Sequence, residues 1–123
     1  MSVRRVIIGL LALPALAVPT AALARTPVGG PNKTPIVKAA LGATVPRQCA
    51  AVYLSTVNGS WASATFDPQH GWRARCSKFG SNGVVVLHRT QGRWRVATEG
   101  SDFTCPIQHV PAAVARDLRI ACR

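Results

Sequence analysis

Four cysteines in a short chain constrain the fold of this protein more than any other feature of its sequence. The 123 residues contain Cys49, Cys76, Cys105 and Cys122. An even number of cysteines in a short exported chain is typical of a disulfide framework. Of the three possible connectivities, we favour Cys49–Cys76 with Cys105–Cys122, because each pair encloses one compact stretch of sequence. No C-x-x-C motif occurs and the histidines are scattered, so we expect neither a metal site nor a cofactor.

The first 24 residues have the features of an export signal. A basic segment with Arg4 and Arg5 precedes an apolar stretch at residues 6–18, and Ala22-Leu23-Ala24 gives the small-x-small pattern of a cleavage site. We expect a signal peptide at residues 1–24, cleaved before Arg25; an uncleaved N-terminal anchor is the alternative. A bilayer span needs about 20 apolar residues, and no later segment qualifies. The mature chain is therefore expected to be secreted, and to be extracellular or associated with the cell envelope.

The mature chain should be strongly basic. Its formal net charge falls from +11 to +9 when Arg4 and Arg5 leave with the signal peptide. An exported cation of this size associates with anionic polymers such as cell-wall polyphosphates, acidic glycans or nucleic acid. Such attraction is salt-dependent and unselective, so the charge predicts a class of partner and no particular ligand.

Two helices are expected around the central part of the chain. Residues 25–33 are rich in proline and glycine and predict a flexible arm before one domain at residues 34–123. The stretch TPIVKAALG then predicts a short helix, with Thr34 as N-cap and Gly42 just after its end. Residues 110–122 predict a longer C-terminal helix whose apolar stripe contains Val114 and Leu118.

Between these helices, the sequence predicts a four-stranded antiparallel meander. The alternation of side chains and the turn residues place the strands at residues 49–56, 61–66, 84–89 and 93–100. Asn58-Gly59 is a strong signal for a hairpin between the first two strands. A long polar connection, residues 67–83, precedes the third strand. The expected fold class is therefore α+β, with one short domain and two disulfides.

The register of the last hairpin, in the stretch HRTQGRWRV, has two solutions. A three-residue link ending at Gly92 places His88 opposite Trp94, and a two-residue turn places Arg89 there instead. We favour the three-residue link. In that register Trp94 and Val96 face the interior, whereas Arg93 and Arg95 face outward.

The chain also resembles a type of uncharacterised small secreted protein of actinobacteria. The resemblance covers roughly residues 34–122 and follows the pattern S-x5-W-A, R-x2-G-x-W-x-V, G-S-x3-C, V-P-x2-V-x2-D-L and a final C. The matching positions are Ser55, Trp61, Ala62, Arg89, Gly92, Trp94, Val96, Gly100, Cys105, Val110, Pro111, Val114, Asp117, Leu118 and Cys122. The resemblance implies a secreted domain and supports the Cys105–Cys122 pairing, but it implies no activity.

The basic residues supply the leading functional hypothesis, a non-catalytic binding protein. Its partner would be an anionic polymer of the cell envelope or a secreted protein. The expected contact residues come from the long connection and from the last hairpin: Trp72, Arg73, Arg75, Lys78, Arg89, Arg93 and Arg95.

Two other hypotheses remain open at this stage. In one, the stapled loop at residues 67–81 enters the cleft of a secreted hydrolase and inhibits it. In the other, His70, His88 and His109 act with arginines in an RNase-like enzyme or toxin, because phosphodiester cleavage needs an acid, a base and a cation. The spacing of these histidines matches no known signature, so we expect no catalytic residue.

Overall fold

The computed structural model describes residue 9, residues 25–80 and residues 82–123. The signal peptide expected at residues 1–24 lies, apart from Gly9, outside the described residues. Among the helices that the structure describes, none has both the length and the apolar character needed to cross a membrane.

An antiparallel sheet organises the domain, as the α+β prediction requires. Its strands follow one another in the order β1-β2-β3-β4-β5, and each pairs antiparallel with the next. The meander is confirmed, but it has five strands and not four. The strands are β1 Thr26–Pro27, β2 Ala50–Leu54, β3 Trp61–Phe66, β4 Val84–Thr90 and β5 Arg93–Gly100.

The additional strand, β1, lies in the segment for which composition predicts a flexible arm. Thr26 pairs with Leu54 and Pro27 with Tyr53, and a 3-10 helix, η1 Gly30–Lys33, follows. Proline and glycine indicated an arm, but proline also fits an edge strand, where an amide donor is not needed. Thr26 and Pro27 are therefore paired in the sheet.

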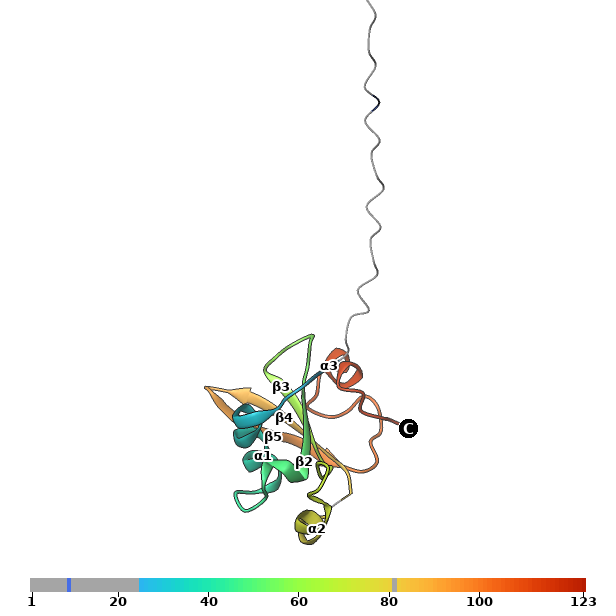
Figure 1. The fold of residues 1–123 in the computed structure, drawn as a ribbon. Coiled ribbons are helices and arrows are strands. Elements are labelled where there is room, and N and C mark those ends of the chain that lie inside the picture. Colours follow the sequence, from blue (N-terminus) through green and yellow to red (C-terminus); the bar gives the residue numbers. More distant parts are fainter. Residues whose placement is uncertain (1–8, 10–24, 81) are drawn as a thin grey trace, which may run out of the picture.

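One face of the sheet is covered by helix α1, Thr34–Leu41. Ile36 and Val37 of this helix pack with Val85 and Leu87 of β4, an inner strand of the sheet, in a first core. The predicted helix is present, but Lys33 is its N-cap because η1 runs directly into it, and Thr34 makes no capping bond. The stripe of apolar side chains fixes α1 across the sheet (Figure 1).

The opposite face of the sheet is covered by the C-terminal segment. Trp61 and Val86 pack there with Val114 and Leu118 in a second core. The helix in this segment, α3 Ala112–Asp117, is shorter than the helix expected at residues 110–122. It ends early because Arg119 adopts a left-handed conformation, with φ 57°.

Both predicted disulfides are present. Cys49 and Cys76 are fully buried, with Cα atoms 5.4 Å apart, whereas Cys105 and Cys122 are exposed, with Cα atoms 5.5 Å apart. The first disulfide ties α2 Arg73–Cys76 to η2 Arg47–Cys49, just before β2. The long polar connection is therefore anchored, and it contains two short helical turns, α2 and η3 Ser77–Phe79.

The hairpin of β4 and β5 adopts the two-residue turn, so the favoured register is wrong. Arg89 lies opposite Trp94, and His88 lies opposite Arg95. Gln91 and Gly92 both have positive φ, 52° and 73°. Positive φ at both central residues is the mark of a type I′ turn, whose twist matches that of the strands better than a type I turn does.

The exposure of the β5 side chains agrees with the prediction at Trp94 and differs from it at Val96. Trp94 packs against the first core, as expected. Val96 was expected to face the interior, but it is 45% exposed at the edge of the sheet. The only irregularity in the pairing of β4 with β5 lies beside Ala97, since Val86 pairs with Thr98 and Leu87 with Val96.

Candidate anion-binding surface

The seven predicted contact residues fall into two groups at opposite ends of β4. The strand begins at Val84, after α2 and η3, and ends at Thr90, next to the hairpin turn. Its length of seven residues corresponds to about 20 Å in an extended strand. Figure 1 shows α2 well separated from the tip of the hairpin. The structure therefore does not bring the two groups together in one surface.

The group around α2 is made of cations that lie over aromatic rings of the same segment. The guanidinium carbon of Arg75 is 4.9 Å from the ring centroid of Trp72, which is half-buried. The Nζ atom of Lys78 is 5.1 Å from the ring centroid of Phe79. Arg73 is exposed. The ring of Trp72 is thus partly covered by Arg75 of the same segment.

The group at the hairpin is arranged around Trp94. The guanidinium carbon of Arg89 is 5.4 Å from the ring centroid of Trp94. Lys38, on the exposed side of α1, and Arg93, at the start of β5, line the same hollow as Trp94. We call these four residues, Lys38, Arg89, Arg93 and Trp94, the Trp94 surface. Arg95 lies opposite His88, so its side chain leaves the sheet on the face away from Trp94. Arg93, opposite Thr90, alternates in the same way and lines the hollow from the end of the strand next to the turn.

Two hollows adjoin the Trp94 ring. One, of about 510 Å³, is lined by Arg89, Ile36 and Leu54 among others. The second, also of about 510 Å³, is lined by Lys38, Arg93 and Pro35. No aspartate or glutamate is among the described residues that line either hollow. Both hollows are therefore bordered by positive charge alone.

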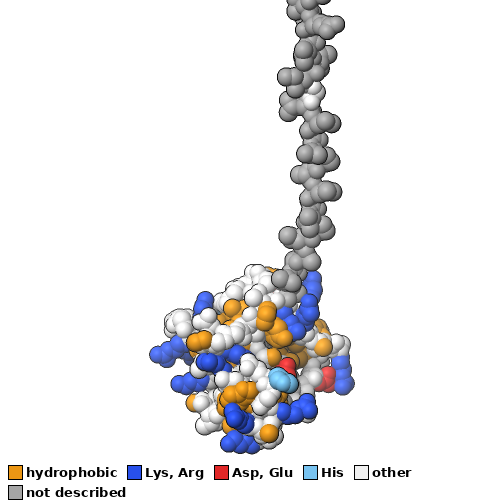
Figure 2. Space-filling view, in the orientation of Figure 1, with side chains coloured by type: hydrophobic (Ala, Val, Ile, Leu, Met, Phe, Trp, Pro, Cys, Tyr) orange, Lys and Arg blue, Asp and Glu red, His pale blue; other side chains and the backbone are white. Residues whose placement is uncertain are grey.

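The acidic side chains of the described domain lie elsewhere. Asp102 forms the one ion pair among the described residues, with 2.9 Å between its Oδ2 and the Nη2 of Arg123. Asp117 accepts hydrogen bonds from Ser55 and Thr56. Glu99 and Asp67 line other hollows. The cations of the Trp94 surface are thus uncompensated, and Figure 2 shows lysine and arginine side chains over several parts of the visible face.

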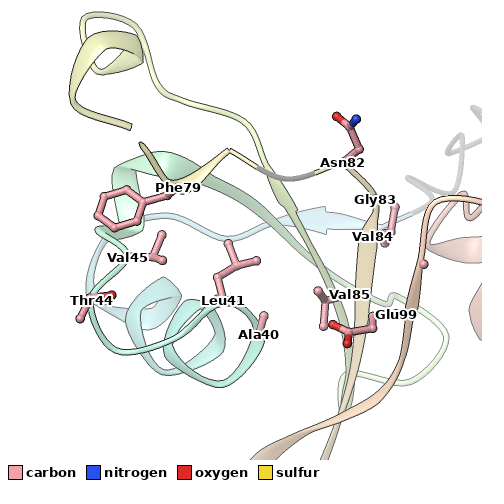
Figure 3. Close-up of a pocket in the computed structure, with 11 residues that line it drawn as sticks. Ala40, Leu41, Thr44, Val45, Phe79, Asn82, Gly83, Val84, Val85 and Glu99 are labelled. Atoms are coloured by element: carbon pink, nitrogen blue, oxygen red, sulfur yellow. The ribbon is translucent and has the colours of Figure 1, made fainter. Parts of the chain in front are cut away.

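The hollow beside Glu99 has no paired catalytic groups in its described lining. Its volume is about 500 Å³. Figure 3 shows Leu41, Val45 and Phe79 on one side, with Val85 and Glu99 on the side of the strands. Glu99 is the only titratable residue among the described lining residues. Acid–base hydrolysis needs a second titrating group or a metal. The described lining of this hollow supplies the carboxylate of Glu99 and no second titrating group.

The histidines of the RNase-like hypothesis lie in different parts of the fold. The ring of His88 stacks on Trp61, with centroids 4.1 Å apart and planes 9° from parallel. Trp61 begins β3, whereas His70 follows beyond its other end, Phe66. His109 is exposed in the segment before α3. His88 thus has a packing role, and no group of three metal-ligating side chains occurs in the described part of the chain.

Lys33 is a buried cation that sequence reasoning missed, because it falls in the segment predicted to be an arm. Its side chain is only 4% exposed. Burial lowers the pKa of Lys33, Asp67 partly offsets this effect, and Arg47 adds to it. Its position between the sheet and the loop at Asp67 makes it a structural residue.

Asp117, the last residue of α3, binds the segment that follows β2. Its carboxylate accepts hydrogen bonds from the Ser55 hydroxyl at 2.8 Å and from the Thr56 amide at 2.7 Å and hydroxyl at 2.6 Å. The Arg25 amide donates a longer one, at 3.4 Å. Partial burial alone would raise the pKa of Asp117, but these hydrogen bonds outweigh it and lower the pKa to about 2.

Comparison with protein-family models, curated proteins and solved structures finds no match to this chain. What the Trp94 surface can bind is therefore inferred from its own side chains.

Proposed function

We propose that this chain is an exported, non-catalytic binding protein whose Trp94 surface holds an anionic polymer of the cell envelope. The observation that carries the proposal is that three cationic residues, Lys38, Arg89 and Arg93, line the two hollows beside one half-exposed tryptophan. Arginine guanidinium groups bind phosphate and carboxylate oxygens in pairs of parallel hydrogen bonds. The surface thus has the chemistry to hold phosphate or carboxylate groups.

A polymer fits this surface better than a single small anion. Trp94 and Pro35 line both hollows, so the hollows are neighbours and anionic groups repeated along one chain can occupy both. Several weak contacts then add along the polymer, and release of its counterions supplies much of the free energy. The domain's large positive charge supports the same class of partner.

The two disulfides support the exported location. Stable disulfides belong to oxidising compartments outside the cytoplasm, and the N-terminal sequence has the pattern of an export signal. A polyanion of the envelope is the partner that such a protein meets first.

The other two hypotheses receive less support from the fold. An inhibitory loop commonly presents an extended segment to a cleft, but part of the loop at residues 67–81 is wound into α2 and η3. The RNase-like hypothesis needs cooperating histidines, and His88 stacks on Trp61 far from His70.

The decisive experiment compares two double variants that lose the same charge. We expect Arg89→Ser with Arg93→Ser to weaken binding of inorganic polyphosphate by about tenfold or more at low salt, and to reduce the slope of log K against log salt by about 1 to 2. The matched control, Arg73→Ser with Arg75→Ser, should change the affinity by less than about threefold. Isothermal titration calorimetry at several salt concentrations measures both, and polygalacturonate tests whether carboxylates serve as well as phosphates.

Equal losses in the two double variants would overturn the proposal. Binding would then follow the total charge of the domain and would not depend on the Trp94 surface.

A further inference from the structure

Arg25 is held by three contacts at the start of the described domain. The guanidinium carbon lies 3.7 Å from the ring centroid of Tyr53, and Nη1 donates a hydrogen bond to the carbonyl of Leu118 at 3.4 Å. The backbone nitrogen points at Asp117, with 3.4 Å to its Oδ1. Strand β1 follows at Thr26. The backbone nitrogen of Arg25 therefore has a fixed position.

The carboxylate that faces this nitrogen has hydrogen bonds but no cationic partner. Asp117 receives its other hydrogen bonds from the neutral groups of Ser55 and Thr56. The one ion pair within 4 Å among the described residues is that of Asp102 with Arg123. The half-buried carboxylate of Asp117 is thus directed at the backbone nitrogen of Arg25 and has no cationic group within ion-pair distance among the described residues.

We propose that cleavage of the Ala24–Arg25 bond turns this nitrogen into an ammonium group that forms an ion pair with Asp117. A signal peptidase adds one water across the amide, so Ala24 leaves as a carboxylate and Arg25 keeps the amino group, which is protonated at neutral pH. Processing thereby completes the site at Asp117 and stabilises the mature domain relative to its precursor. The inference uses the export expected from the sequence and is independent of the Trp94 surface.

The position of the cut decides whether this ion pair can form. Each residue retained before Arg25 moves the amino group up to about 3.6 Å along the chain. A cut after Arg25 would remove the contacts with Tyr53 and Leu118. Cleavage before Arg25 is the position that places the charge within hydrogen-bonding distance of the carboxylate.

The stabilisation by this ion pair should depend on pH through the new amino group. The other charged or titratable side chains around the site are the guanidinium groups of Arg25, Arg116 and Arg119 and the phenol of Tyr53. The new amino group would titrate from near pH 8 upward, because the carboxylate favours its charged form. The stabilisation should be fully present below about pH 8 and disappear as the pH rises further.

The test compares two chains that differ only at the N-terminus. Residues 25–123 contain both cores and both disulfides, so this domain can be released from a fusion protein by a protease that cuts directly before Arg25. The second chain retains Leu23 and Ala24. Urea unfolding at pH 7 should give an unfolding constant about fivefold smaller for the chain that begins at Arg25, and this difference should vanish by pH 10.

Substitution of Asp117 and, separately, of Asp102 tests which carboxylate pairs with the new amino group of Arg25. Asp117→Asn should abolish the difference between the two chains, whereas Asp102→Asn should preserve it. If Asp117→Asn does not fold, acetylation of the Arg25 amino group in the unsubstituted chain should remove the same stability. Equal stability of the two chains at pH 7, a difference that survives in Asp117→Asn, or a secreted N-terminus other than Arg25 by mass spectrometry would each overturn the proposal. None of these results depends on polyphosphate binding, so the two proposals fail separately.

Discussion

Asp117 joins parts of the domain that are distant in the sequence. Its carboxylate at the end of α3 receives hydrogen bonds from Ser55 and Thr56, which follow β2, and from the Arg25 amide. Ser55 also accepts hydrogen bonds from the amides of Val57 and Asn58. One carboxylate thereby holds the turn between β2 and β3 against the C-terminal segment. This turn spans residues 55–60, which is longer than the connection at residues 57–60 that the expected strands left between them.

The low pKa of Asp117 predicts a specific loss of stability in acid. An aspartate in an unfolded chain has a pKa of about 3.9, and Asp117 in the folded domain has a pKa of about 2. Its contribution is present above about pH 4 and is lost as the pH falls toward 2. We expect Asp117→Asn to lower the free energy of unfolding by about 1 kcal/mol at pH 7 and to have little effect at pH 2.

Urea unfolding at pH 7, 4 and 2.5 measures this effect. Asp102→Asn is the matched control, because Asp102 is exposed and its partner Arg123 is 82% exposed. A stability loss in Asp117→Asn that is the same at all three pH values would show that the carboxylate charge is not responsible.

The sequence predicted residue burial well where an apolar pattern was regular, but it missed the partners of polar residues. Val114 and Leu118 were expected to be buried, and they are. The link between Ser55 and Asp117 joins positions 62 apart in the chain, and no local pattern encodes such a pairing.

At the scale of elements, the β4–β5 hairpin presents the Trp94 surface, and its turn contains a strained residue. Gln91 has φ 52°, a left-handed conformation that disfavours most side chains and that asparagine tolerates best after glycine. We expect Gln91→Asn to raise the free energy of unfolding by about 0.5 kcal/mol and Tm by about 2 to 4 °C. Differential scanning calorimetry measures the shift.

Gly92→Ala provides the opposite control for this turn. Gly92 has φ 73°, so a β-carbon there should cost about 1 kcal/mol and lower Tm. If Gln91→Asn lowers Tm, as Gly92→Ala should, the left-handed conformation at residue 91 does not limit the stability of the turn, and the prediction is wrong.

The elements themselves were largely predictable, but the register and the shortest strand were not. Residues 61–66 were expected to form a strand, and β3 has the same bounds. Gly92 suits both a three-residue link and a type I′ turn, so the sequence could not decide between them. Strand β1 has two residues, too few to show any alternation, and its pairing with β2 is visible only in the folded domain.

For the whole molecule, the two disulfides differ in their exposure to solvent. Cys49–Cys76 is fully buried beside α2, whereas both residues of Cys105–Cys122 are exposed. A small reductant should therefore reach Cys105–Cys122 in the native domain, while Cys49–Cys76 should stay intact until the domain unfolds. Loss of a crosslink between residues 17 apart in the sequence should cost about 3 kcal/mol in the chain-entropy model.

Timed reduction with dithiothreitol, followed by alkylation and mass spectrometry, distinguishes the two bonds. We expect an intermediate alkylated at Cys105 and Cys122 alone, with circular dichroism that retains the signal of the sheet. Simultaneous loss of both disulfides would show that the C-terminal segment does not open independently of the rest.

The spatial grouping of the basic residues was beyond sequence analysis for a physical reason. Arg89 and Arg75 are only 14 positions apart in the sequence, but β4 separates their regions by its full length. Lys38 joins the Trp94 surface because α1 packs across the sheet next to β5. Neither relation follows from composition or from local pattern.

The position of β5 at the outer edge of the sheet has a consequence for the protein at high concentration. An eight-residue edge strand exposes amide and carbonyl groups on which a second copy can add its own strand and begin aggregation. Arg93 and Arg95 place like charges along that edge, so two copies that approach side by side repel each other. This repulsion disfavours edge-to-edge pairing of two copies, and concentrated salt, which screens charge, weakens the repulsion.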